Sequence, residues 1–187
     1  MLKPKNNTPC FFTQQVFLIG TYDEDGTERF APISWISYTN GAPACLIISI
    51  NGTKRTKRNI ERTGLLSATV VTPELLAFAE SRNSATADEN NVVVVPTVRG
   101  NVLDVPLIAD SVFSYECQLL KTVELGITHT YFAEIKKVNV RDDIEKLDFY
   151  DLRVINPVIY SPDNYFTVGN HIGRIGDYSQ KQMREDQ

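Results

Sequence analysis

Phe30-Ala31-Pro32-Ile33-Ser34-Trp35, followed by Ser49 and then by Lys54-Arg55-Thr56-Lys57-Arg58-Asn59-Ile60, is the most informative part of this chain. The first block is typical of a strand whose backbone faces a flat ligand with a polar edge. The second block is typical of a helix that opens with hydroxyls and cations, which attract an anion because the first amides of a helix are unpaired. Together the two blocks predict a site for a phosphate-bearing aromatic cofactor. The alternative is a solvated basic face of a helix.

Four segments in this order resemble a known family. Glu28 to Trp35 is similar to an Asn-x-Ala-Pro-x-Ser-Trp strand and Thr56 to Ile60 to a Thr-x-x-Asn-Ile helix, while Gly126 to Ile135 resembles a Gly-x-His-x-x-Phe-x-Gly-Glu strand. Tyr165 to Gly173 resembles the closing segment. The chain thus resembles the flavin reductase-like, FMN-binding split-barrel family, in particular its flavoredoxin branch. The resemblance implies a mainly β fold, a β-barrel with a few helices. In one departure from the family pattern, Ala133 replaces a glycine.

Size and composition predict one domain over residues 1–187, because this length buries a sufficient core without disulfides or metals. No apolar run approaches the roughly 20 residues of a membrane-spanning helix, and the N-terminus has no apolar core of a secretory signal. We therefore expect a cytoplasmic protein with no membrane partner. The net charge of -4 argues against nucleic acid. Cys10, Cys45 and Cys117 are too few and too scattered to predict a disulfide framework or a zinc site.

The hydrophobic pattern predicts strands separated by turns, which favours a barrel. We expect strands over Val16–Tyr22, Glu28–Ser37, Ala44–Ile50, Leu65–Val71, Ser111–Val123 and Thr128–Val140. The first three would form an antiparallel trio, and Ala44–Ile50 would be buried on both faces. Helices are expected over 54–63, ended by Gly64, and from Thr72-Pro73 onward, with the Thr72 hydroxyl as its cap. The polar run Ser81–Asn91 predicts a mobile loop.

The resemblance implies that main-chain groups of one strand contact the polar edge of the isoalloxazine. That strand comprises Ala31, Pro32, Ile33, Ser34 and Trp35. Amides at that edge would stabilise the negative charge of a reduced flavin. On the pattern alone, Ser34 is equally an ordinary strand hydroxyl and Trp35 a core aromatic. No glycine fingerprint in a βαβ unit is present, so NAD(P)H would dock only transiently.

The phosphate is expected between the strand that ends near Ser49 and the basic helix. Thr56 and Asn59 are three residues apart on that helix and would share the phosphate with Ser49. Either Lys54 or Arg55 would supply the charge, and the sequence does not choose between them. Alternatively, Thr56 bonds a carbonyl one turn back and Asn59 caps a loop.

Two residues further along complete the predicted site. The resemblance implies that His129 lies beside the flavin as the catalytic candidate, where it would bond the cofactor or orient a hydride donor; a lone strand histidine is otherwise structural. It also implies that Phe166, with Tyr165 and His171, packs near a cofactor held mainly by helix 54–63 of the other subunit of a homodimer.

The expected function is an NAD(P)H-dependent FMN reductase or a flavoredoxin-like electron-transfer protein. Its electron acceptor would be free flavin, a redox protein or another small molecule. The alternative is a non-catalytic barrel module that holds a nucleotide or flavin without turnover.

Overall fold

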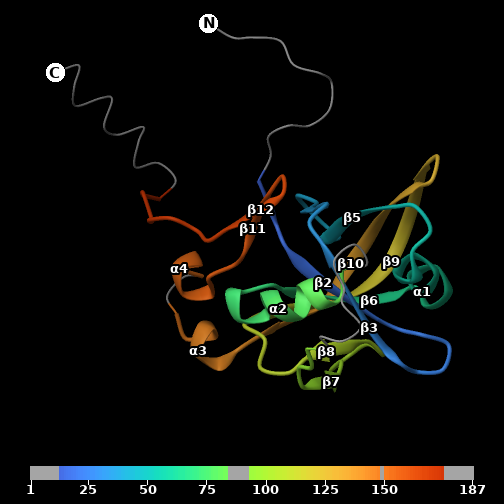
Figure 1. Cartoon of the computed structure of the whole chain (residues 1–187), viewed down its shortest axis with the longest axis horizontal. Coiled ribbons are helices and arrows are strands. Elements are labelled where there is room, and N and C mark those ends of the chain that lie inside the picture. The colour runs from blue at the N-terminus through green and yellow to red at the C-terminus, as the bar shows by residue number, and fades with distance from the viewer. Residues whose placement is uncertain (1–12, 84–92, 148–149, 175–187) are drawn as a thin grey trace, which may run out of the picture.

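The chain forms mainly β structure with a few short helices, as Figure 1 shows for the computed structural model of the protein. The structure describes residues 13–83, 93–147 and 150–174. The strands of the large sheet are β2 (Phe17–Tyr22), β3 (Glu28–Ile33), β4 (Ile36–Tyr38), β5 (Cys45–Asn51), β6 (Leu65–Val70), β9 (Phe113–Leu125) and β10 (Thr128–Val140). Two small sheets consist of β1 (Gln14–Gln15), β11 (Ile159–Ser161) and β12 (Asn164–Phe166), and of β7 (Thr97–Arg99) and β8 (Pro106–Ile108). The helices are α1 (Arg55–Thr63), α2 (Pro73–Ser81), α3 (Asp142–Glu145) and α4 (Leu152–Ile155).

The seven-stranded sheet has to curl because of its strand order, which is β3-β2-β6-β9-β10-β5-β4. In a flat sheet with a spacing of about 4.8 Å between strands, its two edges would lie about 29 Å apart. Yet only Ser34 and Trp35 separate β3 from β4, and a link of this length spans at most about 11 Å. The two edges must therefore approach each other, which turns the sheet into a partly closed barrel.

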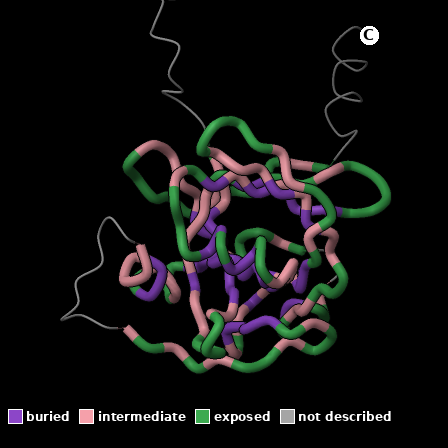
Figure 2. The backbone as a smooth tube through the Cα atoms, turned by 90° about the vertical axis from the view of Figure 1, so that its right-hand side faces the viewer, coloured by how far each residue is buried: buried purple, intermediate pink, exposed green. Residues whose placement is uncertain are grey.

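The curled sheet has a core on each side of β2. Phe17 and Ile19 face the barrel interior, where they join a cluster drawn from β4, β5, β6, β9, β10 and α1. Leu18 faces the other way and packs with Phe30 and with Phe78 of α2. Buried stretches of the backbone consequently lie inward, with exposed loops around them (Figure 2).

Most of the predicted elements are confirmed, with two corrections. The strand predicted over Glu28–Ser37 is divided, because the chain breaks at Ser34-Trp35 to form β3 and β4. The antiparallel pairing of the first three predicted strands is confirmed, since β3 pairs with β2 and β4 pairs with β5, but the break places these two pairs at opposite ends of the sheet. Thr72 precedes α2 as predicted, but its side chain does not bond a helix amide. The loop predicted over Ser81–Asn91 lies largely outside the described residues.

Glu116 fixes the loop between β7 and β8 to the barrel. Its carboxylate, fully buried, accepts hydrogen bonds from the backbone N–H groups of Asn101, Val102 and Leu103 at 2.8–2.9 Å and from Nδ2 of Asn139 at 3.0 Å. Burial alone would raise the pKa of this carboxyl, but the four donors outweigh it and hold the pKa below the ordinary value. The charge of Glu116 therefore stabilises the fold.

We expect Glu116→Gln to lower the free energy of unfolding by about 3 kcal/mol, because the new amide group faces N–H donors in place of an anion. Urea denaturation followed by circular dichroism measures this difference. Glu145→Gln is the matched control, since Glu145 is exposed and makes no side-chain contact with the described residues. An equal loss in both variants would contradict the role given to Glu116.

The same pair of proteins tests the charge of Glu116 through pH. Because its folded pKa is depressed, the stabilisation is present above the unfolded value of 4.5 and is lost as pH falls through the folded pKa. The difference between wild type and Glu116→Gln should therefore shrink as pH falls from 7 toward 3. A difference that stays constant would show that packing, and not charge, carries the effect.

Candidate functional site

Ser49 lies where three of the predicted segments meet. Its backbone N–H donates to the carbonyl of Trp35 at 2.9 Å, and its hydroxyl accepts from Oγ1 of Thr130 at 3.4 Å. Thr130 is the residue opposite Ser49 in the β5–β10 register. The strand break, the end of β5 and the start of β10 are thus brought together, although the sequence predicted neither the break nor these contacts.

The N-terminus of α1 is open to an anion. Lys54 is the N-cap residue, no side chain caps the helix, and no acidic residue lies in its first turn. Thr56 is only 8% exposed, and its hydroxyl makes no hydrogen bond with any residue that the structure describes. A hydroxyl without a partner among the described residues, beside unpaired first-turn amides, is a donor set that suits a phosphate. The predicted alternative, a bond from Thr56 to a carbonyl one turn back, is not observed.

The loop before α1 is tied to the β9–β10 turn. Ile127 accepts a hydrogen bond from the N–H of Gly52 at 3.2 Å and another from Nζ of Lys57 at 3.0 Å. Gly52 has φ of 72°, a conformation that glycine adopts without strain. These bonds fix the start of α1 at one end of the barrel, and they occupy the ammonium group of Lys57.

Asn59 points to the β2–β3 hairpin. Its Nδ2 donates to Asp23 at 2.9 Å and to Thr21 at 3.1 Å, so its donors are already in use. Asp23 also pairs with Arg29 at 2.6 Å and with Arg55 at 3.4 Å. Burial would raise the pKa of Asp23, but these hydrogen bonds and charges together lower it. Asn59 therefore bonds the β2–β3 hairpin, which corresponds to the alternative in which it caps a loop.

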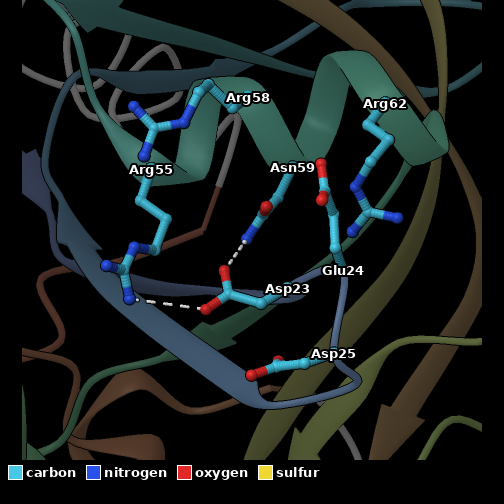
Figure 3. Close-up of a pocket in the computed structure, with 7 residues that line it drawn as sticks. All are labelled: Asp23, Glu24, Asp25, Arg55, Arg58, Asn59 and Arg62. Atoms are coloured by element: carbon cyan, nitrogen blue, oxygen red, sulfur yellow. Dashed lines mark hydrogen bonds and ion pairs between the residues drawn. The ribbon is translucent and has the colours of Figure 1, made fainter.

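A hollow of about 630 Å³ lies between α1 and the tip of this hairpin. Figure 3 shows the three arginines on α1, with Asp23 bonded to Asn59 and Arg55 below them. The lining residues are Asp23, Glu24, Asp25, Arg55, Arg58, Asn59 and Arg62. Three acidic and three basic groups line the hollow, so its formal charges balance and do not favour an anion.

His129 forms a hydrogen-bonded cluster with α1. Its Nδ1 lies 2.7 Å from Oε1 of Glu61, which also accepts from the hydroxyl of Tyr131 at 2.8 Å. Burial would raise the pKa of Glu61, but these bonds, the histidine and Lys57 lower it. His129 shares a face of β10 with Tyr131, whereas Thr130 and Ser49 lie on the other face. The structure therefore brings His129 near the end of the barrel but not onto the face of Ser49.

The two aromatic residues of the predicted site are exposed. Trp35 is 52% exposed, so the alternative of a core aromatic is wrong. Phe166 is 56% exposed in β12. Figure 1 shows that β12 lies apart from α1 of the same chain. Ala31, Pro32 and Ile33 lie in β3, and Ser34 lies in the break that follows it.

Sequence reasoning missed two residues. Thr130 was not identified as the partner of Ser49 because the pairing depends on the β5–β10 register. Glu61 was not identified either, although its spacing of four residues from Lys57 places both on one helix face toward β10. That spacing indicates the shared helix face, but it does not indicate which strand the face contacts.

The whole sequence of these elements matches a family model. The model for the "flavin reductase like domain" matches residues 10–169. The chain belongs to this family. The predicted flavin reductase-like split barrel is therefore confirmed, and membership makes a flavin the expected ligand of the site.

Solved structures of the family have the same fold. Flavoredoxin of Desulfovibrio vulgaris (Miyazaki F) is 21% identical with a TM-score of 0.84, and covers 96% of this chain and 100% of its own. The flavoredoxin from Methanosarcina acetivorans is 19% identical with a TM-score of 0.84, over 98% and 100% of the two chains. A provisionally assigned flavin reductase with a split barrel domain from Shewanella frigidimarina NCIMB 400 is 26% identical with a TM-score of 0.76, over 87% and 85%. Among these three, the two flavoredoxin structures have the higher TM-scores, which shows that the fold is the same.

Two further observations bear on the class of protein. Within the described ranges, no helix is both long and apolar enough to cross a membrane. Cys45 and Cys117 are buried and unpaired, and burial raises the pKa of the Cys117 thiol to about 12. Both thiols are therefore packing residues.

We expect Asp23→Ala to detach the hairpin tip from α1 and to lower the free energy of unfolding by about 1–2 kcal/mol, since it removes bonds to Arg29 and Asn59. Urea denaturation measures the loss. Asp25→Ala is the control on the same turn, because the hydrogen bonds of Asp25 go to Thr27 within the turn and not to α1. A larger loss in the control would contradict the assignment.

Proposed function

We propose that this chain is an FMN-dependent oxidoreductase that accepts hydride from NAD(P)H and passes electrons to free flavin, a redox protein or another small acceptor. Bound FMN would supply the redox chemistry, because its ring accepts a hydride and releases electrons. The residues of the chain bind it, orient the donor and tune the charge around it. A cytoplasmic location stays a prediction.

The open N-terminus of α1 carries this proposal. Thr56 donates its otherwise unpartnered hydroxyl to the phosphate, together with the first-turn amides of α1 and the hydroxyl of Ser49. Lys54 and Arg55 supply positive charge, and Arg55 is held only by a 3.4 Å contact to Asp23. Asn59 contributes indirectly, by fixing α1 to the hairpin through Thr21 and Asp23.

The strand edge at the barrel split suits the ring of a flavin. β3 pairs only with β2, and is thus an edge strand of the described sheet. Main-chain groups of Ala31 to Trp35 bind the polar edge of the ring, and Pro32 is tolerated there because an edge strand does not need its N–H. The exposed indole of Trp35 lies at the same break and covers apolar ring surface.

His129 orients the hydride donor in this proposal. Hydride transfer requires proximity and orientation more than an acid or base, so a fixed imidazole suffices. Its side chain is 19% exposed, which leaves part of the ring accessible. His129 and Ser49 lie on opposite faces of the sheet, so a ligand that contacts both would have to pass over the start of β10, close to the N-terminus of α1.

A homodimer is the proposed active form. The sheet ends in two edges, β3 and β4, and large apolar side chains near them are exposed, among them Trp35 at 52% and Tyr38 at 46%. Burying such edges and side chains against a second copy would stabilise both. In that dimer Phe166 reaches a flavin held mainly by α1 of the other protomer.

The second candidate is a barrel that binds a nucleotide or flavin without turnover, which the separation of His129 from Ser49 favours. Adding NAD(P)H to the flavin-loaded protein distinguishes the two. Bleaching of the yellow flavin spectrum supports the oxidoreductase. A stable yellow spectrum with either nicotinamide supports the binding module.

We expect Thr56→Val to weaken FMN binding by roughly ten-fold to a hundred-fold while leaving riboflavin binding unchanged, because the hydroxyl contacts only the phosphate. Fluorescence titration of the flavin-free protein measures both affinities. Thr63→Val is the control on the same helix, since its hydroxyl bonds Asn59 and Leu65. Equal losses for FMN and riboflavin would remove the phosphate assignment.

Sedimentation equilibrium at low micromolar concentration should give a dimer. Phe166→Ala should then weaken FMN binding without lowering the melting temperature, because this side chain is exposed in the single chain. Val154→Ala, at another exposed apolar position, should leave FMN affinity unchanged. A monomer with full flavin occupancy would contradict the dimer, and normal affinity in Phe166→Ala would remove only the role of Phe166.

A further inference from the structure

Two residues of α1, one turn apart, contact two positions of the β9–β10 hairpin that are two residues apart. Lys57 donates to the carbonyl of Ile127, and one turn later Glu61 contacts His129 and Tyr131. A helical turn rises about 5.4 Å and two strand residues about 6.7 Å, so residues four apart on the helix stay in register with residues two apart on the strand. The position of Glu61 relative to His129 is therefore set by the backbone on both sides.

The contact between Glu61 and His129 defines the protonation of the imidazole. An ionised carboxylate only accepts hydrogen bonds, so Nδ1 of His129, 2.7 Å from Oε1 of Glu61, must be the nitrogen that carries the proton. The lowered pKa of Glu61 keeps it ionised at neutral pH. Tyr131, which is fully buried, donates to the same oxygen and so fixes the carboxylate. In a neutral ring, Nε2 is then left as an acceptor.

We propose that Glu61 is a positioning residue for His129, which holds the imidazole as the Nδ1–H tautomer and fixes its plane so that Nε2 accepts a hydrogen bond from the hydride donor. The role toward ligand rests on the proposed function, whereas the tautomer does not. Glu61 itself does not contact the reacting atoms.

Other charged groups surround this cluster. On β9, Glu124 is the residue opposite His129 in the register, but it is exposed and forms no hydrogen bond with the residues described. On α1, Lys57 lies close enough to Glu61 to lower its pKa. Glu124 therefore places a carboxylate near His129, as Glu61 does, but without a hydrogen bond to Nδ1. This makes it the matched control for Glu61.

The tautomer is measured by nitrogen-15 NMR of the imidazoles above neutral pH, on the flavin-free and the flavin-loaded full-length protein. The chain has only two histidines, and a His171→Gln sample assigns the signals. We expect His129 to be the Nδ1–H tautomer in wild type, in Glu124→Gln and in Tyr131→Phe. Glu61→Gln should also keep it, because the amide oxygen still accepts from Nδ1.

The deciding comparison is between Tyr131→Phe and the double variant Glu61→Ala/Tyr131→Phe, since the phenylalanine leaves no unpaired hydroxyl when the carboxylate is removed. We expect the double variant to lose the Nδ1–H tautomer. We also expect its kcat/KM with NAD(P)H to fall by on the order of ten-fold, with FMN affinity unchanged.

An Nε2–H tautomer in wild type, or an unchanged tautomer in the double variant, overturns the proposal. An equal fall of kcat/KM in Glu124→Gln also overturns it, because charge alone would then explain the effect. If wild type binds no flavin, the proposed function fails, while the tautomer result still decides whether Glu61 orients His129.

Discussion

The two-residue link between β3 and β4 is the constraint on which the rest of the structure depends. It joins strands from opposite ends of a seven-stranded sheet, so the sheet must curl until its edges meet. The curl lets the N–H of Ser49 bond the carbonyl of Trp35, which connects the strand break to β5. From β5 the chain continues into α1, and β10 pairs alongside. The segments that resemble a flavin site therefore meet because the barrel closes there.

The short helix α1 contacts several parts of the fold at once. A helix of nine residues is marginal in isolation, and it is stabilised by its contacts with the barrel. Ile60 enters the barrel core, Asn59 binds the hairpin, and Glu61 binds β10. Its first turn stays uncapped. The polar sequence of α1 is thus explained by contacts on several sides, and the basic residues are only partly a solvated face.

Local features of the fold were predictable from the sequence, whereas contacts between distant segments were not. Gly64 ends α1 with φ of 68°, and β9 and β10 form a hairpin close to the strands expected there. The break at Ser34-Trp35 has no glycine to mark it, and it arises from closure of the barrel. Partners such as Glu61 for His129 depend on how a helix docks on a strand, which periodicity does not encode. The order of motifs, however, was enough to predict the fold, whereas the bond between Ser49 and Trp35 was not predicted.

The charge network at Asp23 limits how a phosphate can be held. Asn59 uses its amide hydrogens on Thr21 and Asp23, so direct recognition falls to Thr56, the helix amides and the cations. Arg55 can take part at little cost, because its contact to Asp23 is long and its side chain is 55% exposed. Asp23 would keep its 2.6 Å bond to Arg29 and its bond to Asn59 if Arg55 turned to the phosphate. The hairpin therefore remains attached to α1 whether or not an anion is bound, and the helix N-terminus is positioned before the ligand arrives.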